Sequence, residues 1–505
     1  MNPPGPKAYR SWTPELYAQQ AHSPATQLPE DDLVFFLIDI VPTLNLSRIH
    51  APYQDETRGA PPFDPAMMTC LLLYAYCVGV FSSRKIAQAC ERNLAFLAIV
   101  GDQRPDFRTI SLFRKDHLEA FADVFVQVLR LAKAAGLVRL GTIAVDGTKV
   151  QGNASRHKAM SYGSMTKEVD RLRAEIDELL KQAQDVDAQD DAALGARRGD
   201  ELPEDLRRRQ DRRATIEAAR KRLEAKARAE AEAERQRRDP VEAERQRTGT
   251  KRRGRPPGPL VETPAEEAQT NFTEPELSIL KTANQGWDCC GNAQASVDDG
   301  CQIILACDVT AQCNDKQQAE PMAQATRGQL DQAGIAPAAD ESGARPQIPA
   351  ALDTGYFSAQ AVEALEREGF DPHIATERQR HPSATPTAAP DSPPPAGAGL
   401  LEPSACPGVP PAAPESPPAT AKEKMQAKLK TPAGRAVYAR RKAIVEPVFG
   451  QIKEARSFRR FLLRGLDKIR GEWRLVCLTH NLLKIWRYGR EILDGSPCAV
   501  VEGRV

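Results

Sequence analysis

The sequence predicts a protein of mixed α/β class, with an all-helical N-terminal domain, a mixed sheet flanked by helices, and a helical insertion that interrupts the sheet. Apolar residues follow helical spacing from residue 31 to residue 131. A β-branched run at 142–145 then opens a set of short strand-like runs, which resumes only after residue 270. Between these groups lie long heptad-like and Ala/Glu/Arg-rich helical patterns.

Length and composition limit the class of protein. The 505 residues correspond to roughly two to four domains. The 69 Lys and Arg nearly balance the 68 Asp and Glu, so a nucleic-acid signal must come from local clusters of charge. The 11 cysteines include no zinc-binding spacing, and we expect reduced, buried thiols. No N-terminal apolar segment and no run near 18 apolar residues occur, which predicts a cytoplasmic protein without a membrane span.

The N-terminal domain is expected over residues 1–135. Its expected helices cover 66–80, 83–97 and 109–131. Short helices with frequent turns permit a helix-turn-helix, and Arg108, Arg114 and Lys115 lie near the start of the third helix, as in a DNA-reading helix. A small helical bundle without DNA contact is the alternative interpretation.

The sheet is expected in two stretches, 140–163 and 271–380. The expected strands cover 142–145, 291–297, 301–309, 350–352 and 373–375, and the expected helices cover 317–333 and 358–368. Asp298-Asp299-Gly300 between the second and third strands predicts a hairpin. The first strand ends in Asp146-Gly147 and the fourth ends at Asp353.

The insertion is expected over residues 164–250 as a helical, coiled-coil-like hairpin. Its first helix carries a heptad seam, Met165, Val169, Leu172, Ile176 and Leu179. A second helix is expected from Leu206 to Arg238. An arm for dimerisation or for spanning DNA and a purely intramolecular hairpin both remain open.

Two linkers follow. The basic linker at 251–270 begins with Lys251-Arg-Arg-Gly-Arg-Pro-Pro257, in which Arg253 and Arg255 flank a glycine. This segment resembles an AT-hook core able to enter a narrow A·T-rich minor groove, although linkers without a function have the same composition. Residues 381–421 are dense in Pro and Ala and are expected to be a disordered linker, and the tail at 491–505 has no functional interpretation.

Positive charge gathers in the C-terminal helical part, 422–490. Residues 421–490 contain 19 Lys and Arg against five Asp and Glu. The stretch Phe458-Arg-Arg-Phe-Leu-Leu-Arg464 alternates aromatic and cationic side chains, which suits phosphate contact and base stacking. The alternative is an amphipathic element with core phenylalanines and solvated arginines.

Three acids are candidates for metal-dependent chemistry: Asp146, Asp353 and Glu446. Phosphodiester hydrolysis is well served by two divalent ions about 3.5–4 Å apart, and carboxylates are the ligands that Mg²⁺ and Mn²⁺ prefer. Two strand ends and one crossing helix could bring the three acids together. Each acid alone also fits a turn, a loop start or a solvated helix face.

The neighbours of Glu446 suggest contacts to DNA. Helical spacing would align Glu446 with Lys442 and with Lys453 two turns later. Tyr438, Arg441 and Lys453 could then hold DNA phosphates beside the carboxylate. Pro447 follows directly, which predicts that Glu446 lies at a helix start or kink.

Together these residues resemble the DDE transposases of the IS4/IS5 type, most closely the IS1182 family of bacterial insertion sequences. The motifs that carry the resemblance are Asp146-Gly-Thr-Lys149, Gly291-Asn-Ala-Gln294, Asn314-Asp-Lys316, Asp353-Thr-Gly-Tyr-Phe357, Val445-Glu-Pro-Val-Phe-Gly-Gln-Ile-Lys453, Arg459-Arg-Phe-Leu-Leu-Arg-Gly465 and His480-Asn-Leu-Leu-Lys484. The resemblance implies an RNase H-like catalytic domain that includes 422–490, with Asp146, Asp353 and Glu446 as ligands of two Mg²⁺ or Mn²⁺ ions. It also implies a Tyr438, Arg441, Glu446, Lys453 signature. Four residues separate Arg441 and Glu446 where the family has three, and Lys442 stands at the family's spacing.

The expected function is that of a DNA transposase that binds terminal inverted repeats, hydrolyses phosphodiester bonds and transfers strands to target DNA. A homodimer in a synaptic complex is expected, acting at the bacterial nucleoid. The expected DNA-contacting residues are Lys149, Tyr438, Arg441, Lys453, Arg459, Arg460, Arg464, Arg253 and Arg255. The alternatives are a decayed or domesticated transposase that only binds DNA, and a structural coiled-coil protein.

Overall fold

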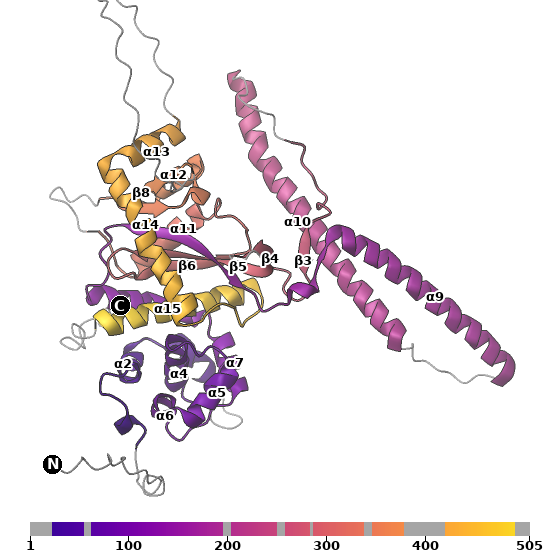
Figure 1. Ribbon diagram of the computed structural model, residues 1–505, viewed down its shortest axis with the longest axis horizontal. Coiled ribbons are helices and arrows are strands. Elements are labelled where there is room, and N and C mark those ends of the chain that lie inside the picture. Colours follow the sequence, from indigo (N-terminus) through magenta and orange to yellow (C-terminus); the bar gives the residue numbers. More distant parts are fainter. Residues whose placement is uncertain are drawn as a thin grey trace, which may run out of the picture.

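The computed structural model describes residues 23–54, 62–194, 204–249, 258–282, 286–337, 346–377 and 420–489. A mixed sheet with helices on its faces stands above the N-terminal helices, and two long helices project to the right (Figure 1). The mixed α/β class and the helical N-terminal region are confirmed. The AT-hook-like segment, nearly all of the Pro/Ala-rich linker and the C-terminal tail lie outside the described residues, so the expectations for them stay predictions.

Seven helices occupy the described part of the N-terminal region. They are α2 (Leu33–Ile40), α3 (Ser47–Gln54), α4 (Pro65–Cys77), α5 (Ser83–Arg92), α6 (Leu94–Val100), α7 (Phe107–Asp116) and α8 (Ala120–Ala134). Two of the expected helices are each divided in two. Asn93 causes the first division, because its side chain accepts the backbone N–H of Ala95 and caps α6. Helix α4 is buried from Met68 to Cys77, as expected for an element apolar on all sides.

The main sheet contains six strands: β1 (Ile143–Gln151), β4 (Ser278–Lys281), β5 (Trp287–Asp298), β6 (Ile304–Thr310), β7 (Ile348–Leu352) and β8 (Phe370–Ile374). Their order is β4-β5-β1-β7-β8, and β6 also pairs with β5. Strand β1 is antiparallel to β5 and parallel to β7, which is parallel to β8. The predicted hairpin is confirmed as β5 and β6. The buried carboxylate of Asp298 closes it by accepting the backbone N–H groups of Leu140 and Gly300.

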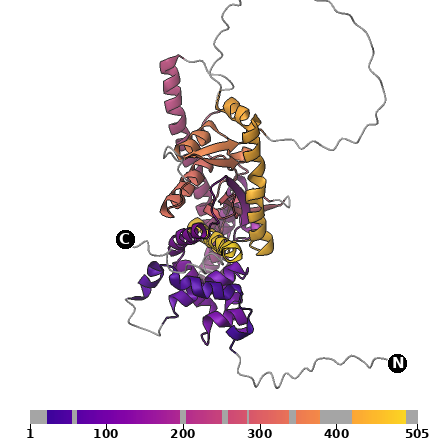
Figure 2. The same cartoon turned by 90° about the vertical axis from the view of Figure 1, so that its left-hand side faces the viewer.

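Helices cover the faces of the sheet. They are α11 (Ala319–Gln332), α12 (Ala359–Arg367), α13 (Ala421–Lys430), α14 (Pro432–Gly450) and α15 (Leu466–Tyr488), with a π-helical turn at Gln451–Ala455. Figure 2 shows α15 between the N-terminal helices and the sheet, with α14 along one side of the sheet. The indole of Trp473 in α15 is fully buried and donates to the Gln294 carbonyl at 3.0 Å.

The insertion consists of α9 (Tyr162–Leu194) and α10 (Glu204–Thr248), which project from a small sheet of β2 (Ala159–Ser161) and β3 (Gln269–Asn271). The helices pack antiparallel along part of their length (Figure 1). The seam residues Met165, Val169 and Leu172 are buried against Ile216 and Ala219. These three residues of the predicted seam therefore pack within one chain.

A buried polar cluster joins the N-terminal region to α15. Arg114 donates to the hydroxyl of Tyr76 at 3.1 Å, and that hydroxyl donates to Glu472 at 3.3 Å. Glu472 also accepts the backbone N–H groups of Leu462 and Leu463 at 2.9 and 3.0 Å. Arg114, expected near a DNA-reading surface, is instead a buried structural residue.

Within the described residues, no single helix is long and apolar enough to cross a membrane, although the bent pair Leu33–Thr43 and Ser47–Tyr53 passes by length and composition alone.

Candidate active site

Parallel pairing of β1 and β7 places two of the predicted acids side by side. The parallel register matches Val145 with Leu352, and Asp146 and Asp353 are the next residue on each strand. Helix α14 crosses this edge of the sheet and brings Arg441 between them. Its guanidinium lies 3.0 Å from Asp146 and 3.3 Å from Asp353, measured from Nη1 to Oδ2 and from Nη2 to Oδ1.

The Arg441 bridge is largely withdrawn from water, with 7% of the side chain exposed. Burial by itself would lower the pKa of Arg441, but the charges of Asp146 and Asp353 outweigh that effect and the pKa is raised. Burial also raises the pKa of Asp146, to about 6, even though the Gly147 N–H and Arg441 favour its charged form. The centre therefore holds two carboxylates around one fixed cation.

A further carboxylate, Asp315, lies beside this pair. The Asn292 and Gln294 side-chain amides both donate to its Oδ1, at 2.7 and 2.8 Å. Its negative charge contributes to raising the pKa of Asp146. Asp315 stands in the motif Asn314-Asp-Lys316, but its sequence position predicts no role for it, because it follows no strand directly. The amide side chains on β5 were the available signal.

Glycine is required at position 147 by this packing. A Cβ there would lie 2.3 Å from Gln294 Nε2 and 2.9 Å from Asp315 Oδ1. Gln294 cannot retreat easily, since it is fully buried and its Oε1 accepts the hydroxyl of Tyr356. The Asp-Gly sequence at the end of the first predicted strand thus reflects close packing against β5, and β1 continues through it to Gln151.

Glu446 is more exposed to solvent than Asp146. It is exposed on α14, although it is near enough to Arg441 for its charge to raise that pKa. Pro447 lies inside α14, three residues before the helix ends at Gly450 and the π-helical turn begins. The helix therefore continues past Glu446, and the acid stands in its last turns.

The chemistry of the donors fits a hard divalent cation only in part. Asp146 and Asp353 offer the carboxylate oxygens that Mg²⁺ and Mn²⁺ prefer. In the described part of the chain, no three His, Cys, Asp or Glu side chains are grouped closely enough to hold a metal ion. A cation between the two aspartates would need Arg441 to withdraw and a further acid to approach.

Three other residues predicted to hold DNA lie on α14, on the π-helical turn after it and on β1: Tyr438, Lys453 and Lys149. The half-buried ring of Tyr438 lies 5.9 Å from the guanidinium of Arg441. Lys453 donates to the hydroxyl of Thr148 and, at 2.7 Å, to the carbonyl of Lys149. Burial lowers the pKa of Lys453. The ammonium of Lys149 is exposed and donates to the Lys281 carbonyl at 2.7 Å.

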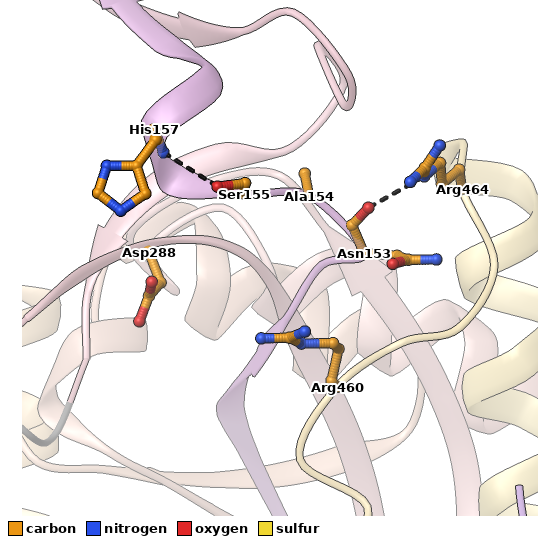
Figure 3. A pocket seen from close by; sticks show the side chains of 7 residues that line it. All are labelled: Asn153, Ala154, Ser155, His157, Asp288, Arg460 and Arg464. Atoms are coloured by element: carbon orange, nitrogen blue, oxygen red, sulfur yellow. Dashed lines mark hydrogen bonds between the residues drawn. The ribbon is translucent and has the colours of Figure 1, made fainter. Parts of the chain in front are cut away.

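In the stretch from Phe458 to Arg464, the arginine side chains are exposed and the two phenylalanine rings are buried. Phe458 and Phe461 are buried, which rules out their stacking on DNA bases in this conformation. Arg459 is exposed and ion-paired with Glu454. Arg460 and Arg464 line a cavity of about 380 Å³ beside the end of β1 (Figure 3). The amphipathic alternative is thus correct for the rings.

Two segments of the chain match known family models. Residues 23–116, which contain α2 to α7, match a model described as "Transposase domain (DUF772)". Residues 415–486, which contain α13, α14 and most of α15, match a model described as "Transposase DDE domain". Glu446 and Arg441 lie inside the second match, whereas Asp146 and Asp353 lie outside both. No curated protein and no solved structure matches the chain.

Proposed function

We propose that the chain is a DDE transposase that cuts and joins the ends of an insertion sequence, because two of its segments match transposase family models in a domain pairing typical of the IS1182 family. The proposed substrates are the terminal inverted repeats and target DNA. The observation that carries the proposal is the pairing of Asp146 with Asp353 at one edge of the sheet.

The proposed catalytic domain is RNase H-like. Its support is the strand order β6-β5-β1-β7-β8, in which three antiparallel strands are followed by two parallel ones. Such a sheet places Asp146, on β1, beside Asp353, which directly follows β7. Helix α14 then adds residues from far along the chain to that edge.

Asp146, Asp353 and Glu446 are the proposed ligands of two Mg²⁺ or Mn²⁺ ions. When bound, these ions would supply activation of the attacking oxygen and stabilisation of the leaving oxygen. In the chain itself, neighbouring strands position Asp146 and Asp353, and Arg441 supplies one positive charge to the two carboxylates. The exposed position of Glu446 leaves it accessible to DNA and solvent.

Lys149, Tyr438, Arg441 and Lys453 are proposed to hold the DNA backbone next to the aspartates. Lys453 already contacts β1 immediately after Asp146, so that a phosphate bound there would lie close to the carboxylates. Arg459, Arg460 and Arg464 would extend this contact along the DNA, and Arg253 and Arg255 would add the minor-groove contact expected from the sequence.

The test is cleavage of a DNA fragment that carries the element's own ends, with Mg²⁺, Mn²⁺ or EDTA. Asp146→Asn, Asp353→Asn and Glu446→Gln should each abolish metal-dependent nicking while end binding is retained. Asp467→Asn is the matched control, because this carboxylate is 97% exposed at the start of α15. Cleavage that survives Glu446→Gln but is lost in Asp315→Asn would move the role of third acid to Asp315.

The same experiment separates the alternative. Specific end binding without cleavage in either metal would favour a decayed or domesticated transposase that only binds DNA. The proposed homodimer is tested on the same samples by measuring mass in solution with and without end DNA, since a synaptic complex holds two ends. We expect the enzyme to act on bacterial DNA in the cytoplasm.

A further inference from the structure

A cavity of about 380 Å³ lies beside the end of β1, away from the aspartate pair. Its lining comes from the segment that follows β1, from β5 and from the loop before α15, and consists of Asn153, Ala154, Ser155, His157, Asp288, Arg460 and Arg464 (Figure 3). We call these residues the arginine pocket.

Backbone pairing builds the arginine pocket. The loop before α15 lies alongside the end of β1, since the N–H of Phe461 donates to the Gln151 carbonyl at 2.8 Å and the N–H of Gln151 donates to the Arg459 carbonyl at 3.2 Å. Asn153 donates to the Leu462 carbonyl at 2.8 Å. The pocket is therefore a fixed part of the sheet edge.

Neither arginine of the pocket forms a salt bridge within the described residues, although Glu274 is near enough to Arg464 for the charge of that arginine to act on the pKa of Glu274. Arg464 donates through Nε to the Asn153 carbonyl at 3.0 Å, which orients its guanidinium. Arg460 makes one long contact, 3.4 Å to the side chain of Gln151. Asp288 accepts from Gln151 at 3.0 Å and forms no ion pair with either arginine. Arg459 precedes Arg460 in the chain but does not line the pocket, and it forms an ion pair with Glu454.

Guanidinium groups that form no salt bridge and lie in a polar cavity suit a phosphate, because their planar fork matches phosphate oxygens. Strand β1 sets most of the distance to the aspartates. Asn153 follows Asp146 by seven residues, of which the five up to Gln151 belong to β1, so that at about 3.3 Å per residue an extended chain spans up to about 23 Å. DNA that runs along β1 with a rise of about 3.4 Å covers this distance in about seven base pairs.

We propose that the arginine pocket binds one phosphodiester group of the end DNA, about seven base pairs from the phosphate that is cut. This inference rests on the proposed function and adds to it a second anchoring point, which sets the register of the DNA on the sheet. A phosphate fixed here and another beside Lys453 would align the duplex with β1.

The test uses the full chain, a fluorescent duplex of the inverted-repeat end, and the variants Arg460→Gln and Arg464→Gln. Each should weaken binding about tenfold and reduce the salt dependence by about one released counterion. Arg367→Gln on α12 is the control and should leave binding unchanged, since this exposed arginine is ion-paired with Glu320 and is not among the proposed DNA contacts. Arg460→Gln keeps the test valid if Arg464→Gln does not fold, because Arg460 makes only the long contact to Gln151.

A scan of neutral methylphosphonates locates the contact. One phosphate at a time is neutralised along each strand from about three to about twelve base pairs inside the cleavage site. The wild type should lose DNA affinity most when the phosphate about seven base pairs from the cleavage site is neutralised. The double variant Arg460→Gln/Arg464→Gln should lose no affinity at that position, while neutralisation at other positions should still weaken its binding.

Equal sensitivity of the wild type and the double variant at every position would overturn the inference. So would equal losses in Arg367→Gln and Arg460→Gln. If the wild type cuts and binds its ends normally while these results are negative, only the pocket assignment fails. If the wild type does not distinguish its ends from unrelated DNA, the proposed function fails and the pocket assignment fails with it.

Discussion

Replacing Gly147 with alanine would insert a methyl group into the tightest contact of the candidate site. The new Cβ would lie 2.3 Å from Gln294 Nε2 and 2.7 Å from Asn292 Oδ1. Ordinary van der Waals contact begins near 3.4 Å, so Gln294 would have to move by about 1 Å. It is fully buried and bonded to both Tyr356 and Asp315, and the shift would strain or break those hydrogen bonds.

Overpacking of this kind costs about 1–3 kcal/mol, and each buried polar group left unpaired costs about 1–3 kcal/mol more. We therefore expect Gly147→Ala to lower the free energy of unfolding by about 3–5 kcal/mol. Urea denaturation followed by circular dichroism would measure this as a lower midpoint at unchanged slope. The same variant should lose cleavage, because Asp315 and Asp146 would shift.

The control is Gly328→Ala in the interior of α11, where a Cβ would meet nothing within 4 Å. Alanine there should stabilise the helix by up to about 1 kcal/mol. A change of less than about 0.5 kcal/mol in Gly147→Ala, within the range of an ordinary surface substitution, would refute the packing argument.

Three further outcomes are expected. Glu472→Ala should destabilise the protein by about 3–5 kcal/mol in urea, since it leaves Arg114 buried without its carboxylate, and a loss below about 1 kcal/mol would contradict this. For Asp146, the pKa raised to about 6 means that the folded state binds more protons than the unfolded chain between about pH 4 and pH 6, so that this group makes stability fall as pH rises. Asp146→Asn removes that effect, so its free energy of unfolding should rise by about 1–3 kcal/mol relative to the wild type between pH 4 and pH 7, as measured by thermal melts. Stability that changes with pH in the same way in both proteins would disprove this expectation. Arg441→Gln removes the cation that competes for the two aspartates and should tighten Mg²⁺ binding about tenfold by calorimetry, an expectation that fails if affinity is unchanged or weaker.

The elements that the sequence predicted best are those with a local signal. The hairpin of β5 and β6 follows from its turn, and the seam at Met165, Val169 and Leu172 follows from heptad spacing. The divided N-terminal helices were missed, because apolar spacing runs through Asn93 while the side chain of that residue starts a new helix.

Interpretations of charged and aromatic residues depended more on tertiary packing. Arg114 and Phe458 carry side chains that suit DNA contact, but both are buried, one beside Glu472 and one in the core. A cationic or aromatic side chain on an amphipathic helix can face solvent or a partner element. Only the packing of α15 against the N-terminal region decides whether such a side chain faces solvent or is buried.

Local patterns alone were sufficient to place Asp353 directly after a strand and Asp146 after the apolar run that opens β1, although β1 itself continues to Gln151. The tertiary structure decided what lies between them. Arg441 is 295 residues from Asp146 in the chain and reaches it only because α14 crosses the parallel pair β1 and β7. Asp315 joins the same edge through amides on β5, since the register of a sheet sets such neighbours and sequence distance does not.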